Sequence, residues 1–419
     1  MRARLTRAST LALSVLITSC QTYDFEPVEP LAITQTTREE TISARKLKPN
    51  IMMLVDVSGS MTDPVDTNDP DCLVEDRGDM VVCGTSVPCN PAVCPTRWTE
   101  LQGAVPSFLS ASGSHVRFGL TTYPEPRGER GIVPFCRPST ELSVRKPLPS
   151  AEDDASLLSH ANDINGILQS IPNAGSGQPE GGTPTSLSLQ FVGSLEALQS
   201  EDRDDYVILL TDGIPNCNPQ NVNSGVNDPT LCKCTLGNTA CAGAAEKLGC
   251  MDMDASVTAV RELKDKDITT IVIGFGKETG AGNGPAVLEG MARAGQFART
   301  CAPGQTSCGP NDPCDPATNL CSRGYFQAGN QAELAQALET ISSALLPGVP
   351  CLVELNPAQL PSDPKLVVVY VEEESMASGD DTWQLTDKGV LFTGATCERI
   401  LRSTPDAPIA VEVRAIRQR

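Results

Sequence analysis

Histidine, aromatic side chains and positive charge are all scarce in this sequence of 419 residues. Its only two histidines are His115 and His160, so a catalytic metal centre built from histidines is excluded. Aromatic residues make up 4% of the chain, and any core must therefore be mainly aliphatic. The chain has 32 Lys and Arg against 52 Asp and Glu, a formal net charge of −20. Such a chain repels phosphate backbones and anionic lipid surfaces, so nucleic-acid binding is not expected.

Long apolar runs are scarce too, and the one that matters lies near the N-terminus. Leu11–Ile17 follows three arginines and is too short to span a bilayer, which is typical of a secretory signal peptide. It leads into Ile17-Thr18-Ser19-Cys20, which resembles the lipobox of bacterial lipoprotein precursors. The resemblance implies a signal peptide and lipobox at 1–20, a diacylglycerol on Cys20, and lipid anchoring in a bacterial cell envelope, facing the periplasm or the exterior. Gln21 stands where an inner-membrane retention signal has Asp, so the outer membrane is favoured, with membrane contact through the lipid anchor only.

The 17 cysteines are the strongest compositional signal. Lipid attachment to Cys20 leaves an even number, and export favours disulfides; zinc, which Cys232 and Cys234 suggest, is the alternative. Most cysteines lie in three polar stretches, expected to be loop insertions held by disulfides, near 62–96, 214–250 and 301–323. We expect pairing within the first and third stretches, Cys136 joined to Cys217 or to a neighbouring loop, and Cys351 joined to Cys397.

The body of the chain alternates strand-like and helix-like patterns. Apolar runs predict strands at 50–55, 116–120, 206–210 and 271–274, and helical spacing predicts helices near 101–108, 187–198, 257–263 and 334–345. This order predicts an α/β fold, a Rossmann-like doubly wound and mostly parallel sheet over 49–346. The polar residues 21–48 are expected to form a flexible tether. Strand-like runs without intervening helices predict a small β-rich module at 350–416.

Start signals precede three of the predicted helices. Pro95-Thr96 precedes the first, and Asn330 with Glu333 three residues later has the capping-box pattern before the last. Thr183-Pro184 places a capping residue and then a proline before the helix near 187–198. Thr183 is therefore predicted to cap that helix. Thr183 also belongs to a pattern of oxygen-bearing residues that is described next.

Oxygen-bearing side chains follow two of the predicted buried strands. Asp56-Val57-Ser58-Gly59-Ser60 follows the first strand, Gly181-Gly182-Thr183-Pro184-Thr185 comes much later, and Asp212 follows the strand at 206–210. Ligands of open α/β sheets gather beyond the carboxyl ends of the strands, and Mg²⁺ prefers six oxygen ligands. Alternate residues of a tight turn can direct three oxygens at one point. The sequence therefore predicts a site for Mg²⁺ or Mn²⁺ made of Asp56, Ser58, Ser60, Thr183 and Asp212.

This three-part pattern resembles the von Willebrand factor type A family and its metal-ion-dependent adhesion site, over roughly residues 49–346. The resemblance implies that Ser58 and Ser60 bind the ion directly, that Asp56 and Asp212 act through water, and that Thr183 joins or leaves as the site changes state. It also implies an open coordination position that a Glu or Asp carboxylate of a protein partner completes. The separation between Asp56 and Thr183 is longer than is usual in the family, which the insertion at 62–96 explains.

These features favour an exported, lipid-anchored protein that binds a protein partner through a divalent metal ion, and not an enzyme. The alternative is a structural scaffold of the cell envelope in which the metal serves folding or assembly. A metal-dependent hydrolase is less favoured, because no histidine stands near the motifs and no Ser/His/Asp set is visible. The chain also lacks a phosphate-binding Gly-rich motif with Lys, so it is not itself an ATPase.

A second metal hypothesis concerns the first insertion. Five oxygen-bearing residues fall close together there: Asp63, Asp66, Asn68, Asp69 and Asp71. Spaced oxygens of this kind can bind Ca²⁺, and Asp63 follows Ser60 at a spacing that resembles the adjacent calcium site of integrin β subunits. The alternative is a solvated acidic loop of turn-forming residues.

Overall fold

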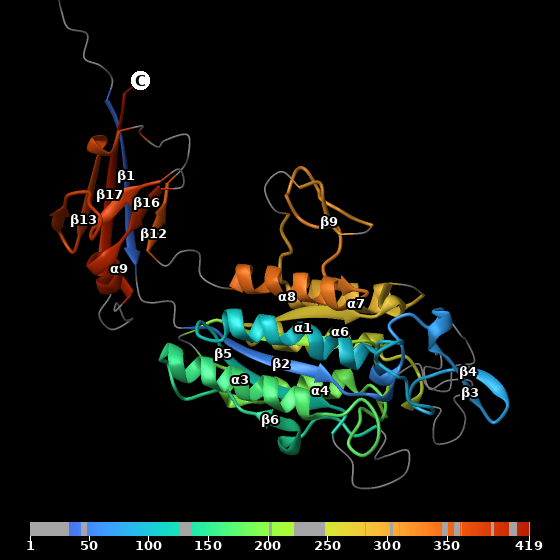
Figure 1. The fold of residues 1–419 in the computed structure, drawn as a ribbon. Helices are drawn as coiled ribbons and strands as arrows, with labels where there is room; N and C mark the ends of the chain where they lie inside the picture. Colours follow the sequence, from blue (N-terminus) through green and yellow to red (C-terminus); the bar gives the residue numbers. More distant parts are fainter. Residues whose placement is uncertain are drawn as a thin grey trace, which may run out of the picture. The chain divides into compact units, whose positions relative to one another are not determined.

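The computed structural model describes most of the chain beyond the predicted signal peptide. The described ranges are 33–42, 48–125, 136–200, 203–221, 248–280, 282–301, 305–309, 311–345, 351–355, 361, 363–386, 389–401 and 409–418. The predicted signal peptide and Cys20 lie outside them. The chain divides into two compact units, and the larger comprises Ile42–Leu352 with Cys397–Ile409 (Figure 1). No helix within the described ranges is long and apolar enough to cross a membrane.

The larger unit is built on a six-stranded sheet in the order β11-β8-β7-β2-β5-β6. Its strands are β2 (Asn50–Asp56), β5 (Arg117–Tyr123), β6 (Val144–Lys146), β7 (Asp205–Thr211), β8 (Ile268–Phe275) and β11 (Phe326–Ala328). Neighbouring strands are parallel except β6, which is antiparallel to β5. This confirms the prediction of a mixed α/β fold with a mostly parallel sheet.

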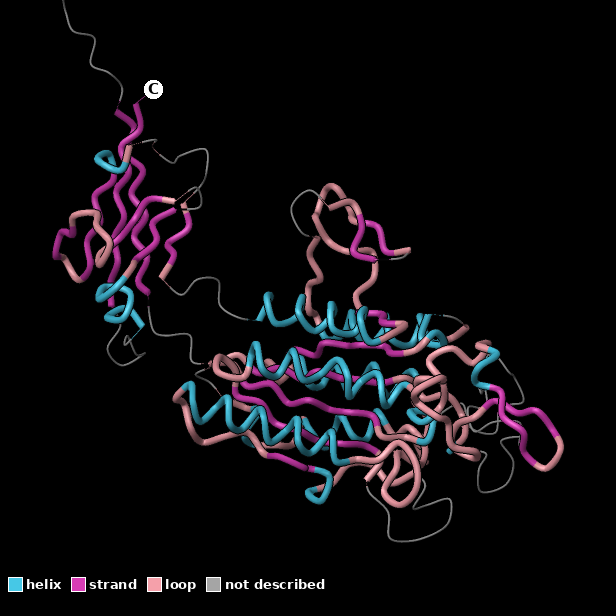
Figure 2. Tube along the Cα trace, in the orientation of Figure 1, coloured by secondary structure: helices cyan, strands magenta, loops and turns pink. Residues whose placement is uncertain are grey.

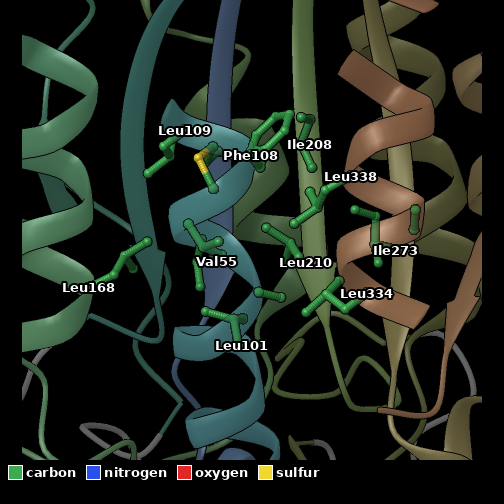
Figure 3. Close-up of a cluster of buried hydrophobic side chains, with 14 of the residues drawn as sticks. Val55, Leu101, Phe108, Leu109, Leu168, Ile208, Leu210, Ile273, Leu334 and Leu338 are labelled. Carbon is green, nitrogen blue, oxygen red and sulfur yellow. The ribbon is translucent and has the colours of Figure 1, made fainter. Parts of the chain in front are cut away.

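Helices cover both faces of this sheet (Figure 2). They are α1 (Arg97–Ser112), α3 (Asp154–Ser170), α4 (Thr185–Val192), α6 (Met253–Lys264), α7 (Gly284–Gly295) and α8 (Gln331–Leu345). Residues of α1, α3 and α8 share one buried cluster with the sheet, and residues of α4, α6 and α7 share a second. Strand β2 supplies alternate residues to the two: Val55 belongs to the first and Leu54 to the second. Figure 3 shows the first cluster, in which Leu338 of α8 points toward Ile208 of the sheet.

Two helix predictions need correction. The helix predicted near 187–198 ends at Val192, and its N-cap residue is Pro184, with no side-chain cap. The prediction that Thr183 caps this helix is therefore wrong, because its backbone is instead held by Asn216. Helix α3 was not predicted, although Leu157, Ala161, Ile164 and Leu168 are its buried residues. By contrast Thr96 caps α1 as predicted, accepting a hydrogen bond from Thr99 N.

The smaller unit is β-rich, as predicted, but its composition differs from the prediction. It holds the four-stranded sheet β1-β17-β13-β14. A three-stranded sheet, β12-β16-β15, is formed by strands between residues 352 and 392. The bounds are β1 (Ile33–Ile42), β12 (Leu352–Glu354), β13 (Val367–Val371), β14 (Glu374–Met376), β15 (Trp383–Leu385), β16 (Gly389–Phe392) and β17 (Ile409–Gln418). Helix α9 (Gly394–Leu401) separates β16 from β17, so the expectation of strands without intervening helices is wrong.

The prediction of a flexible tether over 21–48 is wrong for residues 33–42. These residues form β1, which is hydrogen-bonded to β17 of the smaller unit. The reason lies in the sequence Ile-Thr-Gln-Thr-Thr-Arg-Glu-Glu-Thr-Ile, whose β-branched residues favour strands even though its polarity suggested a linker.

Disulfides hold the first and third insertions, as predicted. Short antiparallel pairs lie within them: β3 (Leu73–Asp76) with β4 (Asp79–Val82), and β9 (Ser307–Gly309) with β10 (Asp312–Pro313). The bonds are Cys72–Cys94 and Cys83–Cys89 in the first, and Cys301–Cys314 and Cys308–Cys321 in the third. Cys136–Cys217 and Cys351–Cys397 confirm the two remaining pairs. Of the second insertion, residues 222–247 lie outside the described ranges.

Shortening Leu338 to alanine tests the packing of α8 on the sheet. Leu338 is fully buried, so Leu338→Ala is expected to lower the free energy of unfolding by about 2–5 kcal/mol. Leu142 is 77% exposed and provides the control. Leu142→Ala is expected to change the free energy of unfolding by less than about 0.5 kcal/mol. Urea unfolding with the disulfides intact measures both, and equal effects would contradict the assigned packing.

Candidate metal centre

The two predicted carboxylate ligands lie at one edge of the sheet. Asp56 is the last residue of β2, and Asp212 directly follows β7. These strands are parallel neighbours in which Val55 is paired with Leu210, so both carboxylates leave the sheet at its carboxyl edge. Both are almost fully buried. The sheet register therefore brings together two acidic residues that lie far apart in the sequence.

A chain of hydrogen bonds connects three of the five predicted ligands. The hydroxyl oxygens of Ser58 and Ser60 lie 3.1 Å apart, and Ser60 Oγ donates to Asp212 Oδ1 at 3.0 Å. Asp56 shapes the turn that carries the serines, because its Oδ1 accepts a hydrogen bond from Ser58 N at 2.8 Å. Both hydroxyls and one carboxylate oxygen thus face a common point.

Thr183 reaches the same place from the loop before α4. Gly59 N donates to Gly181 O at 3.0 Å, which fixes this loop against the serine turn. Gly181 has a φ of +107°, a conformation that favours glycine. Thr183 N donates to Asn216 Oδ1 at 2.7 Å, and Asn216 N donates back to Thr183 O at 2.9 Å. With its backbone held in this way, Thr183 keeps its hydroxyl available to the site.

Gly213 marks a small space beside these hydroxyls. A Cβ built at Gly213 would lie 3.5 Å from Thr183 Oγ1 and 3.7 Å from Ser60 Oγ. The methyl carbon of Thr183 lies 3.8 Å from the same point, but the donor atoms that border the space are both hydroxyl oxygens, which suits a hard divalent cation such as Mg²⁺ or Mn²⁺ and not a thiolate-binding metal. The donor set and the glycine therefore fit the predicted ion.

The electrostatics of the centre are dominated by the two buried carboxylates. Burial, reinforced by the neighbouring Asp212 carboxylate, raises the pKa of Asp56 from 3.8 to about 7. Hydrogen bonds from Ser58 and from Thr211, whose Oγ1 donates to Asp56 Oδ2 at 2.8 Å, act in the opposite direction. Without a cation, ionising Asp56 is therefore costly near neutral pH, which is the situation that a bound positive ion relieves.

Sequence reasoning missed Arg97, the first residue of α1. Its Nη1 donates to Asp212 Oδ2 at 2.7 Å, and the pair is buried on both sides. A signal was present, because a cation in the first turn of a helix opposes the helix dipole and so calls for another partner. Thr211 and Asn216 were also missed, since nothing in their spacing marks them.

Two polar loops support the centre from outside. In the first insertion, Thr85 Oγ1 and Thr62 Oγ1 donate to Gly59 O at 2.6 and 2.8 Å. The loop after β7 is tied to another loop by Cys136–Cys217. Ser58, Thr183 and both carboxylates are at most 5% exposed, whereas Ser60, Gly181 and Gly213 are partly exposed. Access to the centre is therefore narrow.

The acidic side chains of the first insertion make local hydrogen bonds with its backbone. Asp66 Oδ1 accepts from Asn68 N at 3.1 Å, and Asp69 Oδ1 accepts from Asp71 N at 3.0 Å. Asp63 Oδ1 accepts from Thr85 N at 3.3 Å. Within the described ranges, the groups of three or more His, Cys, Asp or Glu with converging ligand atoms consist of cysteines alone. Such hydrogen bonds are typical of turns, and Ca²⁺ binding by this stretch stays a prediction.

Comparisons with known proteins give structural similarities only. No protein-family model and no curated protein sequence matches the chain. The pilus adhesin SpaC from Lactobacillus rhamnosus GG is 15% identical over 92% of this chain, with a TM-score of 0.36. A PilB minor pilin variant from Streptococcus sanguinis is 14% identical over 72%, with a TM-score of 0.41. Manganese-loaded TRAP protein from Plasmodium vivax is 16% identical over 73% of this chain and 76% of its own, with a TM-score of 0.33.

The chain spans 41% of SpaC and 62% of the pilin. These neighbours are an adhesin, a minor pilin and a manganese-loaded protein, at TM-scores too low to carry an argument. The function is therefore argued from the residues of the site.

Proposed function

We propose that this chain is an exported, lipid-anchored protein that binds a protein partner through a divalent ion, Mg²⁺ or Mn²⁺. The observation that carries the proposal is the meeting of hydroxyl and carboxylate oxygens from three separate loops at the carboxyl edge of the sheet. Asp56 ends β2 and Ser58 and Ser60 lie in the loop after it, whereas Thr183 comes from the second loop and Asp212 from the third. A Glu or Asp of the partner completes the coordination shell of the ion.

The surroundings of the centre favour binding over catalysis. His160 lies on α3 with Nε2 3.0 Å from Pro147 O. His115 follows the end of α1, on the order of 24 Å along the helix from Arg97 at its start. Neither histidine therefore lies beside the hydroxyls, and Asp212, the carboxylate that accepts from Ser60 Oγ, is also held by Arg97, which favours a positioning role for it. Non-enzymatic binding is therefore the function we favour over a metal-dependent hydrolase.

Metal titration of the mature chain tests the centre directly. We expect calorimetry at pH 8 to show one Mg²⁺ or Mn²⁺ bound, and Asp56→Ala to abolish binding. Gly213→Ala is the sharper variant, because its added methyl group fits without a clash yet enters the space beside Thr183 and Ser60. It is expected to retain a wild-type melting temperature in EDTA while weakening metal binding about ten-fold or more. Absence of binding by the wild type, or unchanged binding by both variants, would refute the site.

A structural scaffold is the second candidate, and the burial of four of the predicted ligands favours it. Thr183→Ala separates the two functions, since it removes one hydroxyl from the site and leaves the backbone hydrogen bonds with Asn216 intact. For a binding protein, a pull-down from envelope extracts should recover a partner with the wild type in Mg²⁺, and lose it with EDTA or Thr183→Ala. A scaffold would show metal-dependent melting and no partner lost on substitution.

The lipid anchor is proposed from the lipobox pattern at Cys20. We expect mass spectrometry of the N-terminal peptide to show an acylated cysteine, and Cys20→Ser to move the protein from the membrane fraction to the soluble fraction. Membrane association that survives Cys20→Ser would count against lipid anchoring, and it would leave the metal titration unaffected.

A further inference from the structure

A buried cation, Arg97, lies beside the candidate metal centre. Its side chain is 5% exposed, and its Nη1 donates to Asp212 Oδ2 at 2.7 Å. The same nitrogen is 3.4 Å from the backbone oxygen of Ser60. The other oxygen of Asp212, Oδ1, accepts the hydrogen bond from Ser60 Oγ. Asp212 therefore has a guanidinium on one side and the hydroxyls of the site on the other.

Local structure does not explain why an arginine occupies this position. The start of α1 is already capped by Thr96, and a positive charge at the first helical residue opposes the helix dipole. Burying a guanidinium is also unfavourable unless a carboxylate compensates it. Asp212 supplies this compensation, which links the position of Arg97 to the candidate metal centre.

Charge counting then gives Arg97 a role. With both carboxylates ionised, Asp56 and Asp212 contribute two negative charges and Arg97 one positive charge that does not titrate in proteins. A divalent ion leaves this group with one net positive charge, and one carboxylate from outside returns it to neutrality. With a neutral residue at position 97, the ion alone would neutralise the site. Arg97 thus sets how much negative charge the filled site still attracts.

We propose that Arg97 is a specificity-determining residue: it weakens metal binding in the absence of a ligand and makes the metal-loaded site selective for a carboxylate. This inference rests on the proposed function and names the charge its partner must bring. It also gives Arg97 a positioning role, because holding Oδ2 of Asp212 turns Oδ1 toward Ser60.

The experiment is a Mn²⁺ titration of the mature chain at pH 8, with acetate as the carboxylate probe and acetamide as its neutral control. Arg97→Gln removes the charge and keeps hydrogen-bonding capacity, whereas Arg97→Lys keeps the charge and loses the planar fork. In the wild type and Arg97→Lys, acetate should strengthen Mn²⁺ binding and acetamide should not. Arg97→Gln should bind Mn²⁺ about ten-fold or more tightly without acetate, and the acetate effect should disappear.

The outcomes separate this inference from the proposed function. Equal Mn²⁺ affinity and an equal acetate effect in the wild type and Arg97→Gln would overturn the inference and leave the metal site standing. Absence of an acetate effect in the wild type would overturn it even if Arg97→Gln fails to fold. If Arg97→Gln binds Mn²⁺ and the wild type does not, the result would support the charge role of Arg97 and refute the proposed function. If no chain binds Mn²⁺, both are refuted.

Discussion

The burial of two carboxylates at the ends of neighbouring parallel strands is the constraint on which the rest of the site depends. The pairing of β2 with β7 makes it unavoidable that Asp56 and Asp212 share one edge of the sheet. Both side chains are buried, so two negative charges side by side are costly, which raises the pKa of Asp56. Backbone N–H, hydroxyl and guanidinium donors offset part of that cost. What remains is a cluster of oxygens with an excess of negative charge, and the proposed cation site rests on this excess.

The oxygens of this cluster keep their arrangement because the loops that carry them are held in place. The turn that carries the serines is anchored in the core by Met61, with Val57 packed against the same cluster. Hydrogen bonds from Thr62 and Thr85 to one carbonyl, that of Gly59, hold the turn as well. Two disulfides within the first insertion and the Cys136–Cys217 bond limit the conformations open to the unfolded chain and so favour the arranged loops. The first insertion and the Cys136–Cys217 bond therefore help to hold the loops of the site in place.

Sequence patterns predicted the parts of the molecule that burial controls, and missed those that depend on tertiary partners. Strand β2 could be predicted because both its faces are buried, which leaves an unbroken apolar run. Strand β1 could not, because its polar sequence becomes a strand only beside β17. The motif includes Thr183 among the predicted ligands, whereas the assignment of Thr183 as a helix cap was wrong because Asn216, a residue of a distant loop, holds its backbone. Arg97 was missed for the same reason, since its partner follows a strand far along the sequence.

The narrow access to the centre has a consequence for recognition. Among the site residues only Ser60 is partly exposed, with Gly181 and Gly213 beside it, so a bulky substrate cannot surround an ion held there. Under the proposed function, a single extended carboxylate side chain would suit this opening, and the low dielectric around the buried groups would strengthen its attraction to the ion. Affinity would then come from one charged contact at the centre, while discrimination between partners would fall to the disulfide-held loops near it. A site of so few side chains could serve selective binding in this way.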